Sequence, residues 1–167
     1  MRRFGILESL LLLALATGCG VRYGFAGGGL PAHIRTMAVL PFENETASAE
    51  LQRELFELLR RDLRARLGVR EGAETTADAV VRGTIKTYDV DIPVGFSADP
   101  QQAVTARRKL QIILDIEIVD QSNNRVLWER RGLRAEGEYA EQAEAAGRRL
   151  AIQKIVSDVV EGAQSQW

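Results

Sequence analysis

Apolar residues recur at helical spacing in SAELQRELFELLRRDLRARLG, residues 48–68. Leucines occupy one side of a helical projection and charged residues occupy the other, which is the pattern of an amphipathic α-helix. These leucines are Leu51, Leu55, Leu58, Leu59, Leu63 and Leu67. Ser48 can cap the amino end, Glu50 suits the first turn, and Gly68 can end the helix in the left-handed conformation. The pattern therefore predicts a helix over residues 48–68.

A second stretch, residues 140–163, carries a broader apolar stripe that also repeats with helical spacing. The stripe consists of Ala143, Ala146, Leu150, Ile152, Ile155, Val156, Val159 and Val160. Because one face of this segment is apolar along its length, we expect it to form a second helix that packs on the same core as the first.

Two other stretches are typical of β-strands. Residues 36–44, TMAVLPFEN, form a short apolar run that ends at a proline and predict a buried strand. In residues 77–96, the apolar residues occupy odd positions as far as Ile85 and even positions from Tyr88 onward. Because a shift of one residue turns every side chain to the other face of a sheet, we expect a β-bulge or a strong twist near Lys86–Thr87.

Residues 109–120, KLQIILDIEIVD, alternate regularly between apolar and polar positions and predict a strand with one buried face. The turn sequence QSNNR follows, and residues 125–139 then predict the returning strand of a hairpin. Gly132 or Gly137 can interrupt this strand, because glycine weakens strand interiors.

The elements therefore follow the order β-α-β-β-β-α. This order predicts the α+β class: a two-layer sandwich in which two helices pack on one face of a single mixed or antiparallel four-stranded sheet. The other face of the sheet is expected to be largely polar or covered by a partner.

The amino-terminal residues have the features of an export signal. A pair of arginines precedes an apolar stretch that is shorter than the roughly 20 residues needed to span a bilayer. LALATGC, residues 13–19, resembles the bacterial lipobox and contains Cys19, the only cysteine. The resemblance implies removal of a signal peptide, residues 1–18, and a lipid anchor (N-palmitoyl and S-diacylglycerol) on Cys19. The alternative is an ordinary secretory signal, with Cys19 a remaining thiol.

The glycine-rich residues after the cysteine predict a lipidated tether over 19–30, followed by a single domain over 31–167. Gly20 occupies the position where an aspartate commonly retains lipoproteins in the inner membrane. The absence of aspartate at this position favours the outer membrane.

Composition limits the chemistry of the chain. The net charge of −1 gives no overall basicity, so we expect no nucleic-acid partner. His33 is the only histidine and has no second histidine or free cysteine with which to share a metal ion, so we expect a surface or turn residue. Asp89 and Asp91 share one strand face, which can bind a cation but is more typical of a solvated face. No residues suggest catalysis, and we expect neither an enzyme nor a metal or cofactor site.

Basic residues gather at two places on the expected hairpin. Arg107, Arg108 and Lys109 open one strand, and Arg130 and Arg131 lie on the strand that returns beside it. These residues could form a basic patch on the outer face or at the end of the sheet. Arginine binds phosphate through paired hydrogen bonds, so the patch could bind an anionic ligand. The alternative is ordinary surface charge that aids solubility.

Arginines also crowd the last two turns of the first helix. They are Arg60, Arg61, Arg64 and Arg66. Because cations stabilise the carboxyl end of a helix through its dipole, we expect a solvated face here and not a binding site.

Several of these segments together resemble the LptE family of lipopolysaccharide-assembly lipoproteins. The most specific part is YGFAGGGLPAHIRTMAVLPFENET, residues 23–46. The others are ADAVVRGTIKTYDV, residues 77–90, and the segment from RRKLQIILDIEIVD to RVLWE, residues 107–129. With the lipobox, the resemblance covers essentially the whole chain.

The resemblance implies a function. Members of this family lie inside LptD, a large outer-membrane β-barrel, where they plug the barrel, help it fold and bind lipopolysaccharide on its way to the outer leaflet. It implies a lipid-anchored protein on the periplasmic side of the outer membrane. The basic residues Arg107, Arg108, Lys109, Arg130 and Arg131 are then candidate contacts for lipopolysaccharide.

A second resemblance leaves an alternative open. MAVLPFENET is also similar to the first strand of lipoproteins that activate penicillin-binding proteins and of the curli-secretion lipoprotein. Those proteins place a helix between most strands, whereas three strands here are expected to follow one another without a helix. This difference favours the LptE family.

Overall fold

A mixed six-stranded sheet forms the centre of the protein in the computed structural model, which describes residues 29–93 and 107–165. Its strands are β1 (Thr36–Val39), β2 (Glu43–Asn44), β3 (Arg70–Glu71), β4 (Ala79–Pro93), β5 (Arg107–Asp120) and β6 (Arg125–Ala140). The strand order is β3-β1-β4-β5-β6, and β2 also pairs with β4. The pairings of β1, β2 and β3 are parallel, whereas β4, β5 and β6 pair antiparallel.

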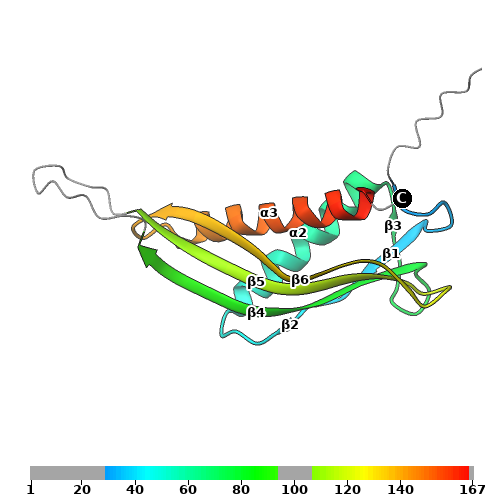
Figure 1. Ribbon diagram of the computed structural model, residues 1–167, viewed down its shortest axis with the longest axis horizontal. Helices are drawn as coiled ribbons and strands as arrows, with labels where there is room; N and C mark the ends of the chain where they lie inside the picture. The colour runs from blue at the N-terminus through cyan, green and yellow to red at the C-terminus, as the bar shows by residue number, and fades with distance from the viewer. Residues whose placement is uncertain (1–28, 94–106, 166–167) are drawn as a thin grey trace, which may run out of the picture.

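Two helices, α2 (Ala49–Leu67) and α3 (Glu144–Ser165), complete the described fold. Both lie over the same face of the curved sheet (Figure 1). Their apolar side chains and the inward side chains of the sheet form one core. The predicted α+β class is confirmed, but the sheet has six strands and not four. The additional strands, β2 and β3, have two residues each and are too short to show a period in the sequence.

Helix α2 begins and ends where the sequence predicts. The hydroxyl of Ser48 accepts a hydrogen bond from the Leu51 amide at 3.3 Å, and Gly68 ends the helix at a φ of 68°. The leucines that face the core are buried: Leu51, Leu55, Leu59 and Leu63. Leu58 and Leu67 are partly buried at the edge of the core.

Helix α3 begins later than predicted, because β6 continues as far as Ala140. Its buried face also differs from the predicted stripe, since Ala146 and Leu150 are exposed to solvent. The residues that the stripe omits but the core buries are Gly147, Arg148, Ala151 and Ala163. Small residues allow the helix to approach the sheet closely but contribute little to an apolar pattern, so the predicted face was wrong at these positions.

The change of phase in the long strand β4 is confirmed. Its pairing register with β5 shifts between Ile85 and Thr87, where the bulge is predicted. Ile85 is buried before the shift, and Tyr88 packs against the same core after it. The bulge therefore lets both parts of the strand turn apolar side chains toward the helices.

Strand β5 shows the predicted alternation. Its inward residues are all buried: Leu110, Ile112, Leu114, Ile116 and Ile118. Strand β6 continues through both glycines at which the sequence allows an interruption, but its pairing with β5 shifts register at Gly132. Gly132 forms a bulge with a φ of 62°, and Gly137 stays in register opposite Leu110.

Some predictions concern residues outside the described ranges. These are the signal peptide of residues 1–18, the lipid anchor at Cys19 and most of the tether of residues 19–30. Neither helix of the described ranges is long and apolar enough to cross a membrane.

A buried carboxylate, Asp120, ties the amino-terminal segment to the turn between β5 and β6. One of its oxygens lies 2.7 Å from His33 Nε2, and the carboxylate also accepts hydrogen bonds from Ser122 and Asn123. Burial by itself raises the pKa of Asp120, but the hydrogen bonds from Ser122, His33 and Asn123 outweigh burial and hold this pKa well below its usual range. His33 keeps 46% of its side chain exposed, in agreement with the predicted surface position.

We expect Asp120→Asn to lower stability by about 1–3 kcal/mol at pH 7, because the amide cannot accept all of these hydrogen bonds. Folding lowers the pKa of Asp120, so its contribution is present above the unfolded value near 3.8 and is lost as the pH falls through the lower folded value. Urea denaturation at several pH values should therefore show a difference between the two proteins that shrinks below about pH 4.

The exposed Asp89 of β4 provides the matched control, Asp89→Asn, which should leave the stability nearly unchanged at every pH. A difference between wild type and Asp120→Asn that stays constant from pH 7 to acid pH would contradict the role given to the Asp120 carboxylate.

Candidate functional site

The basic residues predicted on the hairpin occupy two separate places. Lys109 pairs with Glu138 in the register of β5 and β6, whereas Arg130 lies opposite Ile116. The eight positions of β6 between Glu138 and Arg130 correspond to roughly 25 Å along a strand. The structure therefore does not bring these residues together as one patch.

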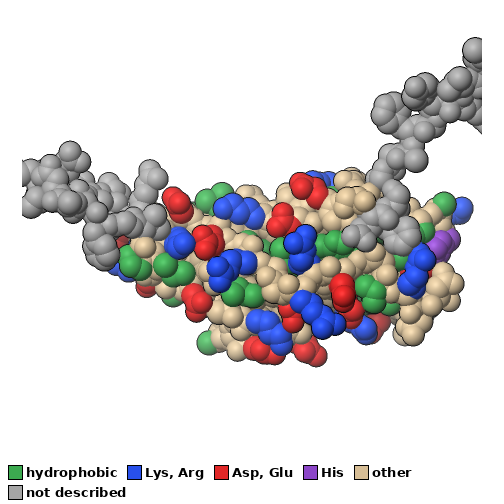
Figure 2. Space-filling view, viewed as in Figure 1, with side chains coloured by type: hydrophobic (Ala, Val, Ile, Leu, Met, Phe, Trp, Pro, Cys, Tyr) green, Lys and Arg blue, Asp and Glu red, His purple; other side chains and the backbone are tan. Residues whose placement is uncertain are grey.

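At the end of β5, the basic residues are paired with carboxylates. Arg108 lies 3.1 Å from Asp91 and 3.4 Å from Glu141, and Lys109 lies 3.1 Å from Glu136. The side chain of Arg107 lies outside the description. Figure 2 shows the same intermixing on a larger scale, since basic and acidic side chains alternate over the face in view.

On β6, Arg131 is exposed and lies 3.8 Å from Glu129, a distance typical of a weak surface pair. Arg130 is also exposed. The predicted alternative for Asp89 and Asp91, a cation site, gains no support, since the described residues contain no group of potential ligands that could hold a metal ion. Asp91 instead accepts a hydrogen bond from Tyr139 at 2.8 Å.

The charged group that the sequence does not reveal is Arg148 of α3, whose side chain is 6% exposed. Its guanidinium binds both carboxylate oxygens of Glu54 at 3.0 and 3.1 Å. It also lies 3.0 Å from Glu50 and 3.2 Å from Glu144. The hydrogen bonds to Glu54, followed by the one to Tyr88, raise the pKa of Arg148 although burial lowers it, so the group stays charged. It joins α2 to α3.

Tyr88 of β4 extends this network to the sheet. Its hydroxyl donates a hydrogen bond to Glu144 and lies 3.5 Å from Arg148. Burial, followed by the hydrogen bond to Glu144, raises the pKa of Tyr88 to about 12, so the phenol is neutral at physiological pH. The network of Tyr88, Glu54, Glu144 and Arg148 therefore joins three elements, β4, α2 and α3.

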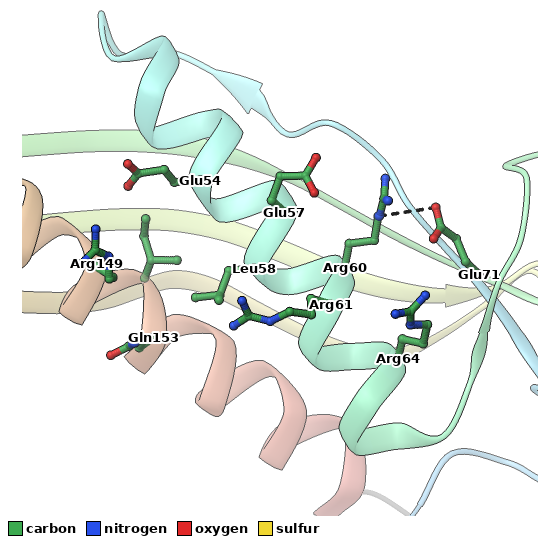
Figure 3. A pocket seen from close by; sticks show the side chains of 10 residues that line it. Glu54, Glu57, Leu58, Arg60, Arg61, Arg64, Glu71, Arg149 and Gln153 are labelled. Atoms are coloured by element: carbon green, nitrogen blue, oxygen red, sulfur yellow. Dashed lines mark ion pairs between the residues drawn. The ribbon is translucent and has the colours of Figure 1, made fainter.

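Next to this network, a groove of about 590 Å³ extends across α2, from α3 on one side to Glu71 of β3 on the other (Figure 3). Arginines line it from both helices: Arg60, Arg61 and Arg64 from α2, and Arg149 from α3. Leu58 and Ile152 supply its apolar part. The volume falls within the range of small-molecule sites in proteins.

Some of the groove residues already have partners. Arg60 lies 3.5 Å from Glu71, and its guanidinium lies 5.7 Å from the centre of the Phe56 ring. Glu54 is bound by Arg148. Arg61 pairs only with its neighbour Asp62 in the described chain, at 3.0 Å. Helical spacing places Arg60 and Arg64 on the same side of α2, which is why both border the groove.

The sequence predicts a solvated face for the arginines at the end of α2. Arg60, Arg61 and Arg64 instead border the groove, and Arg66 donates a hydrogen bond to Ser157 of α3 at 3.3 Å. Only the position of α3 beside α2 turns part of the charged face into the wall of a groove. The sequence gives no indication that Arg149 lines a groove, because exposed arginines are common on helices.

The fold defines the class of this protein: an α+β domain with one open mixed sheet whose one face carries two helices. The family model of LptE, described as lipopolysaccharide-assembly, matches residues 34–162. The match covers more than half of the chain, which therefore belongs to the LptE family. No curated protein sequence matches the chain.

Solved structures share the fold. The hypothetical protein CT253 from Chlamydia trachomatis has a TM-score of 0.54 and 13% identity, and the match covers 78% of this chain and 96% of that chain. Protein XCC0632 from Xanthomonas campestris has a TM-score of 0.54 and 10% identity, with coverage of 79% and 86%. At such low identity these similarities concern the fold alone.

Proposed function

We propose that this chain is a lipid-anchored lipoprotein on the periplasmic side of the outer membrane. It plugs an LptD-like β-barrel, assists the assembly of that barrel and helps to insert lipopolysaccharide into the outer leaflet. The observation that carries this proposal is the match of the LptE family model to residues 34–162. We propose a binding and assembly role and no catalytic one.

The sheet offers a surface suited to the polar interior of a barrel. The face turned away from the helices carries ion pairs. Arg82 of β4 pairs with Glu117 of β5, and Lys86 of β4 pairs with Glu45, which directly follows β2. Side chains of both signs can exchange these partners for polar groups of a surrounding wall. The mixed charges of this sheet face support its docking on the interior of the barrel. The helices on the opposite face are then available for other contacts.

The basic residues of the hairpin remain the proposed contacts for lipopolysaccharide. Arg108, Lys109 and Arg131 are in ion pairs with partly exposed carboxylates, which contribute little and can be displaced by phosphate. Arg107 and Arg130 complete the proposed set. Because the two groups lie far apart along the hairpin, each would contact a different part of a large ligand.

The test is a mild detergent extraction of native outer membranes with this chain as bait, followed by mass spectrometry. We expect a large β-barrel protein in about equal amount, together with lipopolysaccharide. Cys19→Ala, which removes the proposed acylation site, should reduce the amount of bait in the membrane fraction while leaving its fold unchanged.

Recovery of a penicillin-binding protein, or of the bait alone as an oligomer, would contradict the barrel proposal and favour the activator or pore alternative. Retention of Cys19→Ala in the outer membrane at the wild-type level would contradict the role of the lipid anchor.

A further inference from the structure

The groove across α2 carries its cations at separate places along its length. Figure 3 shows Arg149 at the end beside α3 and Arg64 at the end beside Glu71 of β3. Leu58 and Arg61 lie between these two ends in the same view. The side chains of Arg149 and Arg64 point apart, so one compact anion cannot bind both of them. A ligand that contacts the whole groove has to be extended and to carry several anionic groups.

The ion pairs of the fold leave several of these cations available. Arg64 and Arg149 make no ion pair within residues 29–93 and 107–165. Arg61 pairs with the adjacent Asp62 at 3.0 Å, and its side chain remains 66% exposed. An exposed pair of this kind is worth little and is readily exchanged for another carboxylate.

The carboxylates of the groove oppose these cations only in part. Glu54 is bound on both oxygens by the buried Arg148, and Glu71 lies 3.5 Å from Arg60. Glu57 is the remaining lining carboxylate. The available guanidiniums therefore outnumber the available carboxylates, so the groove favours an anionic ligand although the whole chain has a net charge of −1.

Helix stability does not account for all of these arginines. Arg64 lies in the last turn of α2, where the helix dipole favours a cation. Arg149 lies in the second turn of α3, near the amino end, where the dipole gives a cation no stabilisation. Cations at both ends of one groove, supplied by different helices, are therefore an arrangement that helix stability alone does not require.

The middle of the groove is partly apolar. Leu58 is only partly buried, and the buried Ile152 borders the same space. Because Leu58 lies between the two ends that carry Arg149 and Arg64, a complementary ligand presents anionic groups at its ends and an apolar group between them.

An extended acidic peptide has this distribution of groups. Side chains two residues apart in an extended chain point the same way and lie about 7 Å from each other. Carboxylates separated along such a chain can each meet a different guanidinium, and an apolar side chain between them can contact Leu58. Arginine binds a carboxylate through paired hydrogen bonds, which gives each contact a defined geometry.

We propose that this groove binds an extended acidic segment of a partner protein, in which Asp or Glu residues lie on both sides of an apolar residue. Arg149 binds a carboxylate at one end of the segment, Arg64 binds a carboxylate at the other end, and Leu58 contacts the apolar residue. The site lies on the helix layer. It therefore does not depend on the sheet face or on the hairpin residues to which a barrel and lipopolysaccharide are assigned above.

The first test selects short random peptides, displayed on phage, on the full chain in a non-ionic detergent at an ionic strength of about 0.1 M. The same library is selected on the double variant Arg64→Gln/Arg149→Gln and on Arg53→Gln. Arg53→Gln is the matched control, because Arg53 is exposed on α2 but does not line the groove. We expect the wild type and the control to enrich peptides with acidic residues on both sides of an apolar residue, and the double variant to lose this enrichment.

The second test is calorimetric titration with the most enriched peptide. Arg64→Gln and Arg149→Gln should each weaken its binding about fivefold. Because the two arginines lie at opposite ends of the groove, the double variant should show the product of the two effects, about 25-fold. A peptide whose first acidic residues are replaced by their amides should lose its sensitivity to one of the two substitutions and keep its sensitivity to the other.

Failure of the wild type to enrich acidic peptides would overturn the proposal, as would equal affinity of the double variant and the wild type for the enriched peptide. Displacement of the peptide by an equal concentration of inorganic pyrophosphate would also overturn it, since a compact anion would then suffice. Urea denaturation of the same proteins checks that the exposed substitutions leave the fold intact. The outcome is independent of the membrane extraction, because neither peptide experiment contains a barrel or lipopolysaccharide.

Discussion

Arg148→Met should lower the free energy of unfolding by about 3 kcal/mol. The substitution keeps the apolar stem and removes the guanidinium, which leaves Glu54 without its two hydrogen bonds and Glu50 and Glu144 without a cation. Removal of one partner from a buried ion pair is costly because the other charges remain desolvated. These carboxylates retain partial access to water, so the effect lies at the lower end of the usual range. Urea denaturation followed by circular dichroism measures it.

Arg149→Met is the matched control, since Arg149 is the next residue of the same helix and is exposed without an ion pair in the described ranges. It should change stability by less than about 0.5 kcal/mol. Equal effects of the two substitutions would show that the network around Arg148 contributes no more than ordinary surface charge.

Loss of Arg148 should also affect the groove. Glu54 borders the groove, and within residues 29–93 and 107–165 its cationic partner is Arg148, so its carboxylate becomes available in the variant. The network thus serves two purposes, since it joins the helices and keeps the groove positively charged.

Gly137→Ala should lower stability by about 2–3 kcal/mol. A Cβ atom at position 137 would overlap the carbonyl oxygen of Gly147 and lie 2.7 Å from its carbonyl carbon. Both atoms belong to the backbone of α3, so a rotamer change cannot relieve the clash and the helix has to move away from β6. The loss outweighs the smaller conformational freedom of alanine in the unfolded chain. The same urea denaturation measures it.

Gly132→Ala gives the comparison on the same strand. Gly132 has a φ of 62°, which strains any other residue, but a Cβ atom there meets nothing within 4 Å. We expect a cost of about 1 kcal/mol from backbone strain alone. A Gly137→Ala protein as stable as Gly132→Ala would show that α3 can shift from the sheet without loss of packing.

The sequence by itself determined the elements whose side chains repeat with a clear period. The leucines of α2 occupy one face, and Ser48 and Gly68 limit that helix through local backbone chemistry. The alternation of β5 and the change of phase near Lys86–Thr87 follow from the same principle, because period two assigns each residue to one face of a sheet. These patterns are local, so they can be recognised without knowing which elements pack against each other.

Tertiary structure alone decided the rest. The two-residue strands β2 and β3 form through their pairing with β4 and β1, respectively. The buried face of α3 depends on close contact between Gly137 and Gly147, and glycine leaves no apolar mark in a sequence.

Charged residues show most clearly what the sequence alone cannot predict. Arg148 and Arg149 are neighbours with the same chemistry, yet one is buried among carboxylates and the other borders a groove. The sequence specifies the charges of these residues, but the environment of each charge depends on which elements the fold places around it. For that reason the helix faces were predictable, and the groove between them was not.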